Sequence, residues 1–211
     1  MAVICPTVTA QDPHAYRAQM NRITPFAKRI HIDLMDGLFA PTISPKPSQI
    51  WWPDGITADI HLMYQKPMEY IEQLIEAHPH LVIIHNEADV HHMHFAALLH
   101  RAGIEVGLAL LHDTPVEYAE QIMHSFDHVL IFSGNLGFHG GVADLRLMEK
   151  IAQIRQNHPD VEIGWDGGIN IENVQKLCRA GVDVLNIGGA VQQSDDPAAA
   201  YATLNSAISD L

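Results

Sequence analysis

The chain has 211 residues, of which 47% are hydrophobic and 18% are charged, as expected for one globular domain. Twelve basic against 25 acidic side chains give a formal net charge of −13, which argues against nucleic acid or an anionic membrane surface as a partner. No long apolar run or secretory signal is visible, and the two cysteines, Cys5 and Cys178, are expected to be reduced thiols of a cytoplasmic protein.

Short apolar strands alternate with amphipathic helices along the whole chain. The expected strands are, in chain order, Ala2–Val8, Arg29–Met35, Ala58–Met63, Leu81–His85, Glu105–Leu110, His128–Phe132, Glu162–Trp165 and Val184–Ile187. The helical stretches between and after them include "PMEYIEQLIEAHP", "HFAALLHRAG", "VEYAEQIMHSF", "ADLRLMEKIAQIRQNHP", "ENVQKLCRAG" and "DPAAAYATLNSAI". The proline-rich segment 40–57 is expected to hold only a short helix.

Each helix in this alternation is a crossover between parallel strands. Eight such units favour closure into a (β/α)8 TIM barrel, because an open doubly wound sheet usually carries a glycine-rich turn after its first strand. Here that turn reads "PTVTAQDP" and contains no glycine. Since no linker or shift in composition divides the chain, residues 1–211 are expected to form a single α/β barrel domain.

Polar side chains occur at every second position of three expected strands, in "HIDLM", "DIHLM" and "EIGWDGG". Successive strand residues point to opposite faces, so these polar residues share one face and the apolar residues share the other. In a barrel the apolar row packs on the helices. His31, Asp33, His61 and Asp166 are therefore expected to face the interior, near the C-terminal ends of their strands, where such barrels keep their active sites.

Two imidazoles and two carboxylates that converge at this end can hold one divalent metal ion, and zinc, iron, manganese and cobalt all remain open. The ion would neutralise carboxylates that are costly to bury alone. A buried hydrogen-bond network without a metal is the alternative reading of each residue taken singly. Four such residues on three strands favour the metal.

Asp33 and Asp166 lie on strands that are separated by three of eight steps around the ring, so they are expected to face each other across the barrel mouth. A substrate between them would have one carboxyl group on each side. This arrangement suits inversion of a carbon next to a carbonyl: one carboxylate removes a proton, an enediolate forms, and the other carboxyl group returns a proton to the opposite face.

Glycines cluster after the last three expected strands, in "GNLGFHGG", "DGGIN" and "NIGGA". The loops after strands seven and eight of such barrels often bind phosphate through backbone N–H groups. A tight turn without a ligand is the alternative for any single cluster, but three in succession favour a phosphate cradle. The loop 134–141 is expected to close over the ligand as a lid.

The stretches "HIDLMDGLFAPTI", "DIHLM", "IIHNEA", "NLGFHGG", "WDGGIN" and "VLNIGGA", in this order and spacing, resemble the ribulose-phosphate 3-epimerase family over essentially the whole chain. The resemblance implies a homo-oligomeric (β/α)8 enzyme that interconverts D-ribulose 5-phosphate and D-xylulose 5-phosphate, a reaction of the pentose phosphate pathway. It also implies that His31, Asp33, His61 and Asp166 bind the metal, and that Asp33 and Asp166 are the catalytic acid and base.

The resemblance further implies contacts with the sugar and its phosphate. These fall on Thr7, His61, Gly137, Phe138, His139, Gly140, Gly167, Gly168, Gly188 and Gly189. Met35 and Met63 match methionines that line the site beneath the substrate, and ordinary core filling is an equally open explanation of both.

Several positions depart from the usual pattern of the family. They are Thr7 for serine, Leu38 for histidine, Thr42 for asparagine, Phe132 for methionine, Leu136 for proline, His139 for glycine and Gly189 for serine. None removes a metal ligand or a catalytic carboxylate, but lid and rim shape set substrate discrimination. A 3-epimerase of a six-carbon ketose phosphate such as D-allulose 6-phosphate therefore remains an alternative. So does a phosphate-binding barrel that no longer epimerises, which the intact Asp33 and Asp166 argue against.

Overall fold

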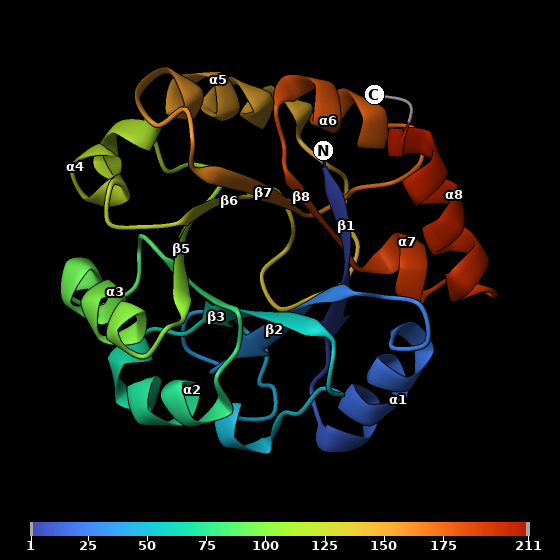
Figure 1. The fold of residues 1–211 in the computed structure, drawn as a ribbon, viewed down its shortest axis with the longest axis horizontal. Helices are drawn as coiled ribbons and strands as arrows, with labels where there is room; N and C mark the ends of the chain where they lie inside the picture. Colours follow the sequence, from blue (N-terminus) through green and yellow to red (C-terminus); the bar gives the residue numbers. More distant parts are fainter. Residues whose placement is uncertain (1, 210–211) are drawn as a thin grey trace.

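The structure, a computed structural model, describes residues 2–209 and contains eight parallel strands that close into a barrel in chain order (Figure 1). The strands are β1 (Val3–Thr9), β2 (Arg29–Met35), β3 (Thr57–Met63), β4 (Leu81–His85), β5 (Glu105–Leu110), β6 (His128–Phe132), β7 (Glu162–Asp166) and β8 (Val184–Ile187). The pairing of β8 with β1 completes the ring, so the predicted (β/α)8 barrel is confirmed. The predicted domain ends, residues 1 and 211, lie outside the described residues.

Five strands have the predicted bounds, and β1, β3 and β7 differ from them by one residue at one or both ends. The strand β7 runs one residue further than predicted because the carbonyl of Asp166 accepts a hydrogen bond from the Ser133 N–H at 2.7 Å. This extra residue is one of the predicted site residues.

The helices form a ring around the strands (Figure 1). They are α1 (Pro13–Ile23), α2 (Ile71–Ala77), α3 (His92–Arg101), α4 (Glu120–Met123), α5 (Met148–Asn157), α6 (Val174–Ala180), α7 (Gly189–Gln192) and α8 (Pro197–Ser209). Short 3₁₀ turns η2 (Pro67–Tyr70), η3 (Val116–Tyr118) and η4 (Leu145–Leu147) begin three of the predicted helical stretches, and η1 (Pro47–Gln49) is the short helix expected in the proline-rich segment. Within the described residues, no helix combines the length and apolar character that crossing a bilayer requires.

The main hydrophobic core lies between the sheet and the helices. The outward row of β2, formed by Ile30, Ile32 and Leu34, is completely buried there. A fully buried aliphatic side chain contributes about 1.5–3 kcal/mol, so this layer supplies most of the burial energy. Because the outward row is apolar, the alternate row of each strand, with its polar residues, faces the barrel interior.

A charged network fills the N-terminal end of the barrel interior. The guanidinium of Arg29 donates to Asp59 through Nε at 2.6 Å and to both carboxylate oxygens of Glu162 at 2.8 and 2.9 Å. A ring nitrogen of His128 lies 2.8 Å from the same Glu162 carboxylate. The network links β2, β3, β6 and β7 across the ring, and it was not predicted from the sequence.

The substitution Glu162→Gln is expected to lower the free energy of unfolding by about 1–3 kcal/mol at neutral pH. Burial alone would raise the pKa of Glu162, but the hydrogen bonds of Arg29 and His128 outweigh it and hold the pKa below its usual range. The folded state thus holds this proton less tightly than the unfolded state, whose pKa is about 4.3. The contribution is complete above that pH and is lost as the pH falls below it.

Urea unfolding at pH 7 and near pH 3 measures this effect. The difference between the wild type and Glu162→Gln should be smaller near pH 3 than at pH 7, whereas the same change at the exposed Glu172 should alter neither value. An equal deficit at both pH values would contradict the proposed role of the carboxylate.

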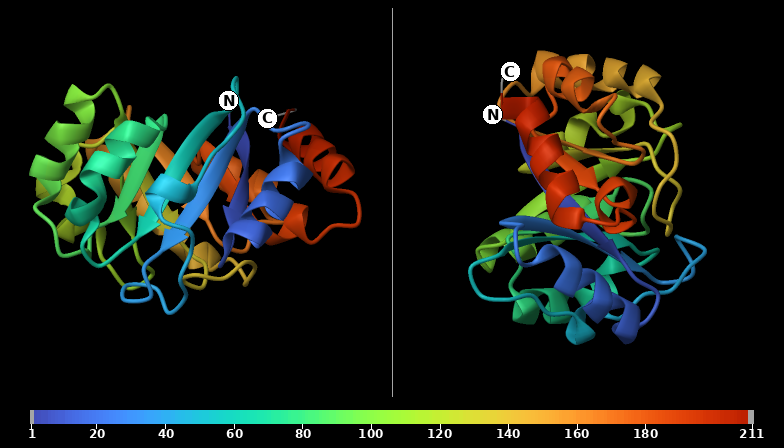
Figure 2. Two further views of the ribbon diagram at one scale, coloured as in Figure 1. Left: turned by 90° about the horizontal axis from the view of Figure 1, so that it is seen from below. Right: turned by 90° about the vertical axis from the view of Figure 1, so that its right-hand side faces the viewer.

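The loops after β2 and β6 lie together at the other end of the barrel, and Figure 2 shows them (blue and gold, left view) beyond the ends of the strands. The Thr42 hydroxyl donates to the carbonyl of Gly137 at 3.0 Å. Gly137 has φ +81°, and a Cβ there would lie only 2.0 Å from that hydroxyl oxygen. The loop predicted to be a lid is therefore in contact with the β2 loop, and this contact requires glycine.

Candidate functional site

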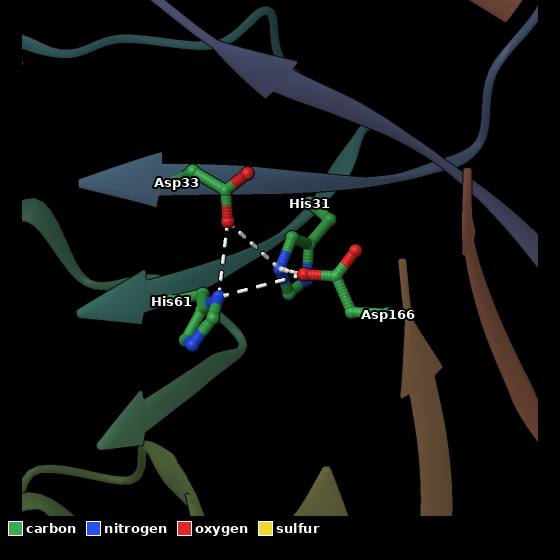
Figure 3. A group of neighbouring side chains, drawn as sticks. All are labelled: His31, Asp33, His61 and Asp166. Carbon is green, nitrogen blue, oxygen red and sulfur yellow. Dashed lines mark hydrogen bonds and ion pairs between the residues drawn. The ribbon is translucent and has the colours of Figure 1, made fainter. Parts of the chain in front are cut away.

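Four side chains from three strands meet at the C-terminal end of the barrel interior (Figure 3). The nitrogen Nε2 of His31 lies 3.3 Å from Asp33 Oδ1 and 3.8 Å from Asp166 Oδ2. The nitrogen Nδ1 of His61 lies 3.0 and 3.7 Å from the same two oxygens. All four residues are buried, so the predicted convergence of two imidazoles and two carboxyl groups is present.

Strand register produces this cluster. His31 and Asp33 are two residues apart on β2 and share its inner face, and Asp33 is paired directly with His61 of β3. Asp166 is the last residue of β7 and reaches the cluster from three steps away around the ring. Residues far apart in sequence are thus brought together by pairing that the alternation pattern already implies.

The cluster fits a divalent metal ion. Four ligands bound tetrahedrally at about 2.1 Å would be separated by about 3.4 Å, and the four measured separations of 3.0–3.8 Å bracket that value. All four candidate ligand atoms lie within 4.8 Å of one another. Both ring nitrogens of His31 are buried and have no hydrogen-bond partner in residues 2–209. A cation bound to Nε2 would give one of these two nitrogens a partner.

The two carboxyl groups have pKa shifts in opposite directions. Burial and the negative charge of Asp33 raise the pKa of Asp166 above its usual range. Burial would also raise the pKa of Asp33, but the His31 and His61 imidazoles beside its Oδ1 outweigh burial and lower it. Burial lowers the pKa of His61 to about 3, so this imidazole is neutral and has a lone pair to offer. The two carboxyl groups therefore differ in acidity, and Asp33 loses its proton more readily than Asp166.

Thr9 orients the ionised carboxylate. Its hydroxyl donates to Asp33 Oδ2 at 2.6 Å, which leaves Oδ1 for the cluster. Thr9 lies on the inner face of β1 and is paired with Asp33 in the sheet. Sequence reasoning missed this residue, although its position two residues after Thr7 was a usable signal.

A cavity of about 380 Å³ lies over the cluster. Most predicted contact residues line it, namely Thr7, Asp33, Met63, Gly137, Phe138, His139, Gly140, Asp166, Gly167, Gly168, Gly188 and Gly189. His31 and His61 do not line the cavity and have 0% exposure, which places them beneath its floor. Met35 does not line it either, and packs with Met63 and Ala40 in a small apolar cluster.

His85 and Glu87 extend the site behind His61 and were missed. The Nε2 atoms of His61 and His85 are 2.8 Å apart, and Nδ1 of His85 faces Glu87 Oε2 at 3.5 Å. If His61 offers Nδ1 to a metal, its proton lies on Nε2 and is donated to His85, whose own proton then points at Glu87. Both residues lie in "IIHNEA", where a histidine on the inward row of β4 was the available signal.

The substitution His85→Leu is expected to weaken metal binding about 10- to 100-fold. It leaves the Nε2–H of His61 without an acceptor, so the proton is no longer held on Nε2 and Nδ1 is no longer kept available for the metal. The matched variant His85→Gln keeps an acceptor oxygen and should lose less affinity. Competition with a chelator of known affinity measures both dissociation constants. Wild-type affinity in the leucine variant would show that His85 does not position His61.

Two further polar groups face the cavity without partners. Asn186 of β8 is 1% exposed, and neither atom of its amide has a hydrogen-bond partner in residues 2–209. The buried hydroxyl oxygen of Thr7 is also without one. Leaving such groups unsatisfied costs about 1–3 kcal/mol each, so both are suited to a hydroxylated ligand. Thr7 was predicted as a contact, whereas "VLNIGGA" reads as an apolar strand and Asn186 was overlooked.

Comparison with known sequences identifies similar proteins along nearly the whole chain. A family model described as the ribulose-phosphate 3 epimerase family matches residues 3–192. The ribulose-phosphate 3-epimerase of Mycobacterium tuberculosis is 31% identical over 209 residues, which cover 96% of this chain and 91% of that protein. The enzyme of the same name from Bacillus subtilis is 29% identical over 208 residues and covers 93% and 94%.

Solved structures share the fold at much lower identity. The 3-hexulose-6-phosphate synthase from Salmonella typhimurium has a TM-score of 0.73 at 14% identity, and the alignment covers 97% of each chain. KGPDC from Streptococcus mutans has a TM-score of 0.74 at 8% identity, and the alignment covers 100% of this chain and 98% of that one. These structures support the barrel architecture alone.

Proposed function

Because this chain belongs to the ribulose-phosphate 3-epimerase family, we propose that it is a metal-dependent isomerase that inverts C3 of a ketose phosphate. The proposed pair is D-ribulose 5-phosphate and D-xylulose 5-phosphate. One observation carries the proposal: Asp33 and Asp166 reach the same cavity from β2 and β7, with pKa shifts of opposite sign. A two-carboxyl inversion needs such a pair of one base and one acid.

In the proposed reaction, ionised Asp33 removes the proton from C3 on one face of the bound sugar. The Thr9 hydroxyl holds the carboxylate in the required orientation through its 2.6 Å hydrogen bond. Protonated Asp166 then delivers its proton to C3 from the other face. The reverse reaction exchanges the two roles, so the enzyme is returned to its starting protonation state after one turn in each direction.

The residues that would hold the cation are His31, Asp33, His61 and Asp166. When bound, a divalent ion of zinc, iron, manganese or cobalt supplies positive charge for the oxygens of an enediolate. Neutral His61 would bind the ion through Nδ1, and His31 would bind it through Nε2, which has no hydrogen-bond partner in residues 2–209. Both imidazoles are completely buried beneath the cavity.

The proposed phosphate site is the backbone of the glycine loops after β6, β7 and β8. Gly168 has φ +69°, and a Cβ there would lie 2.0 Å from the N atom of Ala143, so the loops approach one another closely. Gly167, Gly188 and Gly189 line the same end of the cavity. Backbone N–H groups can bind a phosphate here without lysine or arginine, which suits a chain with net charge −13.

Incubation with single ketose phosphates in deuterated water tests the proposal. The purified, metal-loaded protein should convert D-ribulose 5-phosphate to D-xylulose 5-phosphate, with deuterium appearing at C3 of the product. Conversion of D-allulose 6-phosphate alone would support the six-carbon alternative. Absence of both epimer and C3 deuterium for every ketose phosphate tried would refute the epimerase function and leave a phosphate-binding barrel. The cytoplasmic location and the homo-oligomer stay predictions.

A further inference from the structure

The cavity over the four-residue cluster is poor in positive charge. Of the residues that line it, all within the described part of the chain, none is lysine or arginine. Two lining residues, Asp33 and Asp166, are acids, and His139 is the only lining residue whose side chain can become a cation. A phosphate dianion that enters this space can therefore gain a side-chain charge contact from His139 alone.

Gln19 of α1 fixes the orientation of His139. The amide of Gln19 is itself held in one orientation by Thr9, because its Nε2 donates to the Thr9 carbonyl and its Oε1 accepts from the Thr9 N–H, both at 2.9 Å. The same Oε1 lies 3.0 Å from Nε2 of His139. Since an oxygen acceptor faces Nε2, that nitrogen must carry a proton, and in the neutral ring the lone pair is on Nδ1.

The free nitrogen points at the glycine loop after β8. A Cβ built on Gly188 would lie 2.6 Å from Nδ1 of His139, so the ring edge stands directly over that loop. Within residues 2–209, no protein group forms a hydrogen bond to Nδ1. Burial lowers the pKa of His139 and the charge of Asp33 acts in the opposite sense, so the ligand-free ring is neutral near pH 7.

We propose that His139 is a phosphate-binding side chain that makes this site specific for phosphorylated over unphosphorylated ketoses. In the complex the ring is an imidazolium: Nε2 donates to Gln19 and Nδ1 donates to a phosphate oxygen. The added proton comes from solvent or from the monoanionic form of the phosphate, and it is released with the ligand. The inference rests on the proposed function for the location of the phosphate. The family usually has glycine at this position, and glycine has no side chain that could make this contact.

Calorimetric titration of the metal-loaded protein with inorganic phosphate and, separately, with unphosphorylated D-ribulose tests the inference. The substitutions His139→Ala and His139→Gly should each weaken phosphate binding about 10- to 100-fold, the range for a charge-assisted hydrogen bond. Affinity for D-ribulose should stay within about twofold of the wild type. The control variant His94→Ala removes an exposed imidazole on α3 and should change neither affinity.

Nitrogen-15 NMR of histidine-labelled protein gives a second readout. The Nδ1 resonance of His139, assigned by its absence in His139→Ala, should move from an unprotonated to a protonated position when phosphate is added, while Nε2 stays protonated. Unchanged phosphate affinity in both variants, equal losses for phosphate and D-ribulose, or an Nδ1 that stays unprotonated in the complex would each overturn the inference. If the wild type epimerises normally but the His139 variants keep its phosphate affinity, this inference is refuted and the proposed function stands. If the wild type binds phosphate through His139 but epimerises no ketose phosphate, the proposed function is refuted and this inference stands.

Discussion

The substitution Asp166→Asn is expected to abolish epimerisation, with kcat falling about 10²- to 10⁴-fold, while one half of the reaction survives. Asp33 is intact in this variant and can still remove the C3 proton of one epimer and return a solvent deuteron to the same face. That epimer should therefore acquire deuterium at C3 without inversion. Asp33→Asn should show the complementary behaviour, with exchange confined to the other epimer.

Mass spectrometry and NMR of each separated epimer in deuterated water measure exchange and inversion independently. Metal content must be determined for both variants, because each substitution also removes a candidate ligand oxygen. The variant Asp54→Asn alters an exposed carboxylate that belongs to neither the cluster nor the cavity lining, and it should behave as the wild type. Exchange of both epimers by a single variant would show that the two carboxyl groups do not act on opposite faces.

Removal of the metal by a chelator is expected to abolish activity and to lower Tm, and addition of a divalent ion should restore both. A ligand present at about 100 times its Kd stabilises the folded state by about 2.7 kcal/mol, which corresponds to a Tm shift of about 5–10 °C for a chain of this size. The effect arises because the four ligand groups are assembled in the folded protein alone.

The shift in Tm should shrink as the pH falls, because the ion competes with protons for the carboxylates and imidazoles of the cluster. A His61→Ala variant serves as the control, since its Tm should respond much less to the chelator. If the wild type shows the same Tm and activity with and without the chelator, the four residues form a metal-free hydrogen-bond network.

The barrel and the four-residue cluster were predictable because both follow from periodicity. A period of two in β2 places His31 and Asp33 on one face, and the apolar row between them identifies that face as the interior. Parallel closure then brings the C-terminal ends of β3 and β7 to the same place. Local pattern and chain order sufficed, so no long-range contact had to be guessed.

The residues that were missed depend on contacts between distant side chains. Arg29 reads as an ordinary polar residue at a strand start, and its partner Glu162 lies 133 positions away. His85 gains its role from a 2.8 Å contact with His61. Such pairings depend on side-chain conformations that strand periodicity does not determine.

The Arg29 network and the cluster lie at opposite ends of one set of strands, and this separation has an evolutionary consequence. Four of the seven positions at which the chain departs from the usual pattern of the family fall on connecting loops, namely Leu38, Thr42, Leu136 and His139. Substitutions in those loops can thus change substrate specificity without breaking the Arg29 ion pairs that stabilise the folded state. Substrate specificity can therefore diverge among such barrels while the stability of the fold is retained.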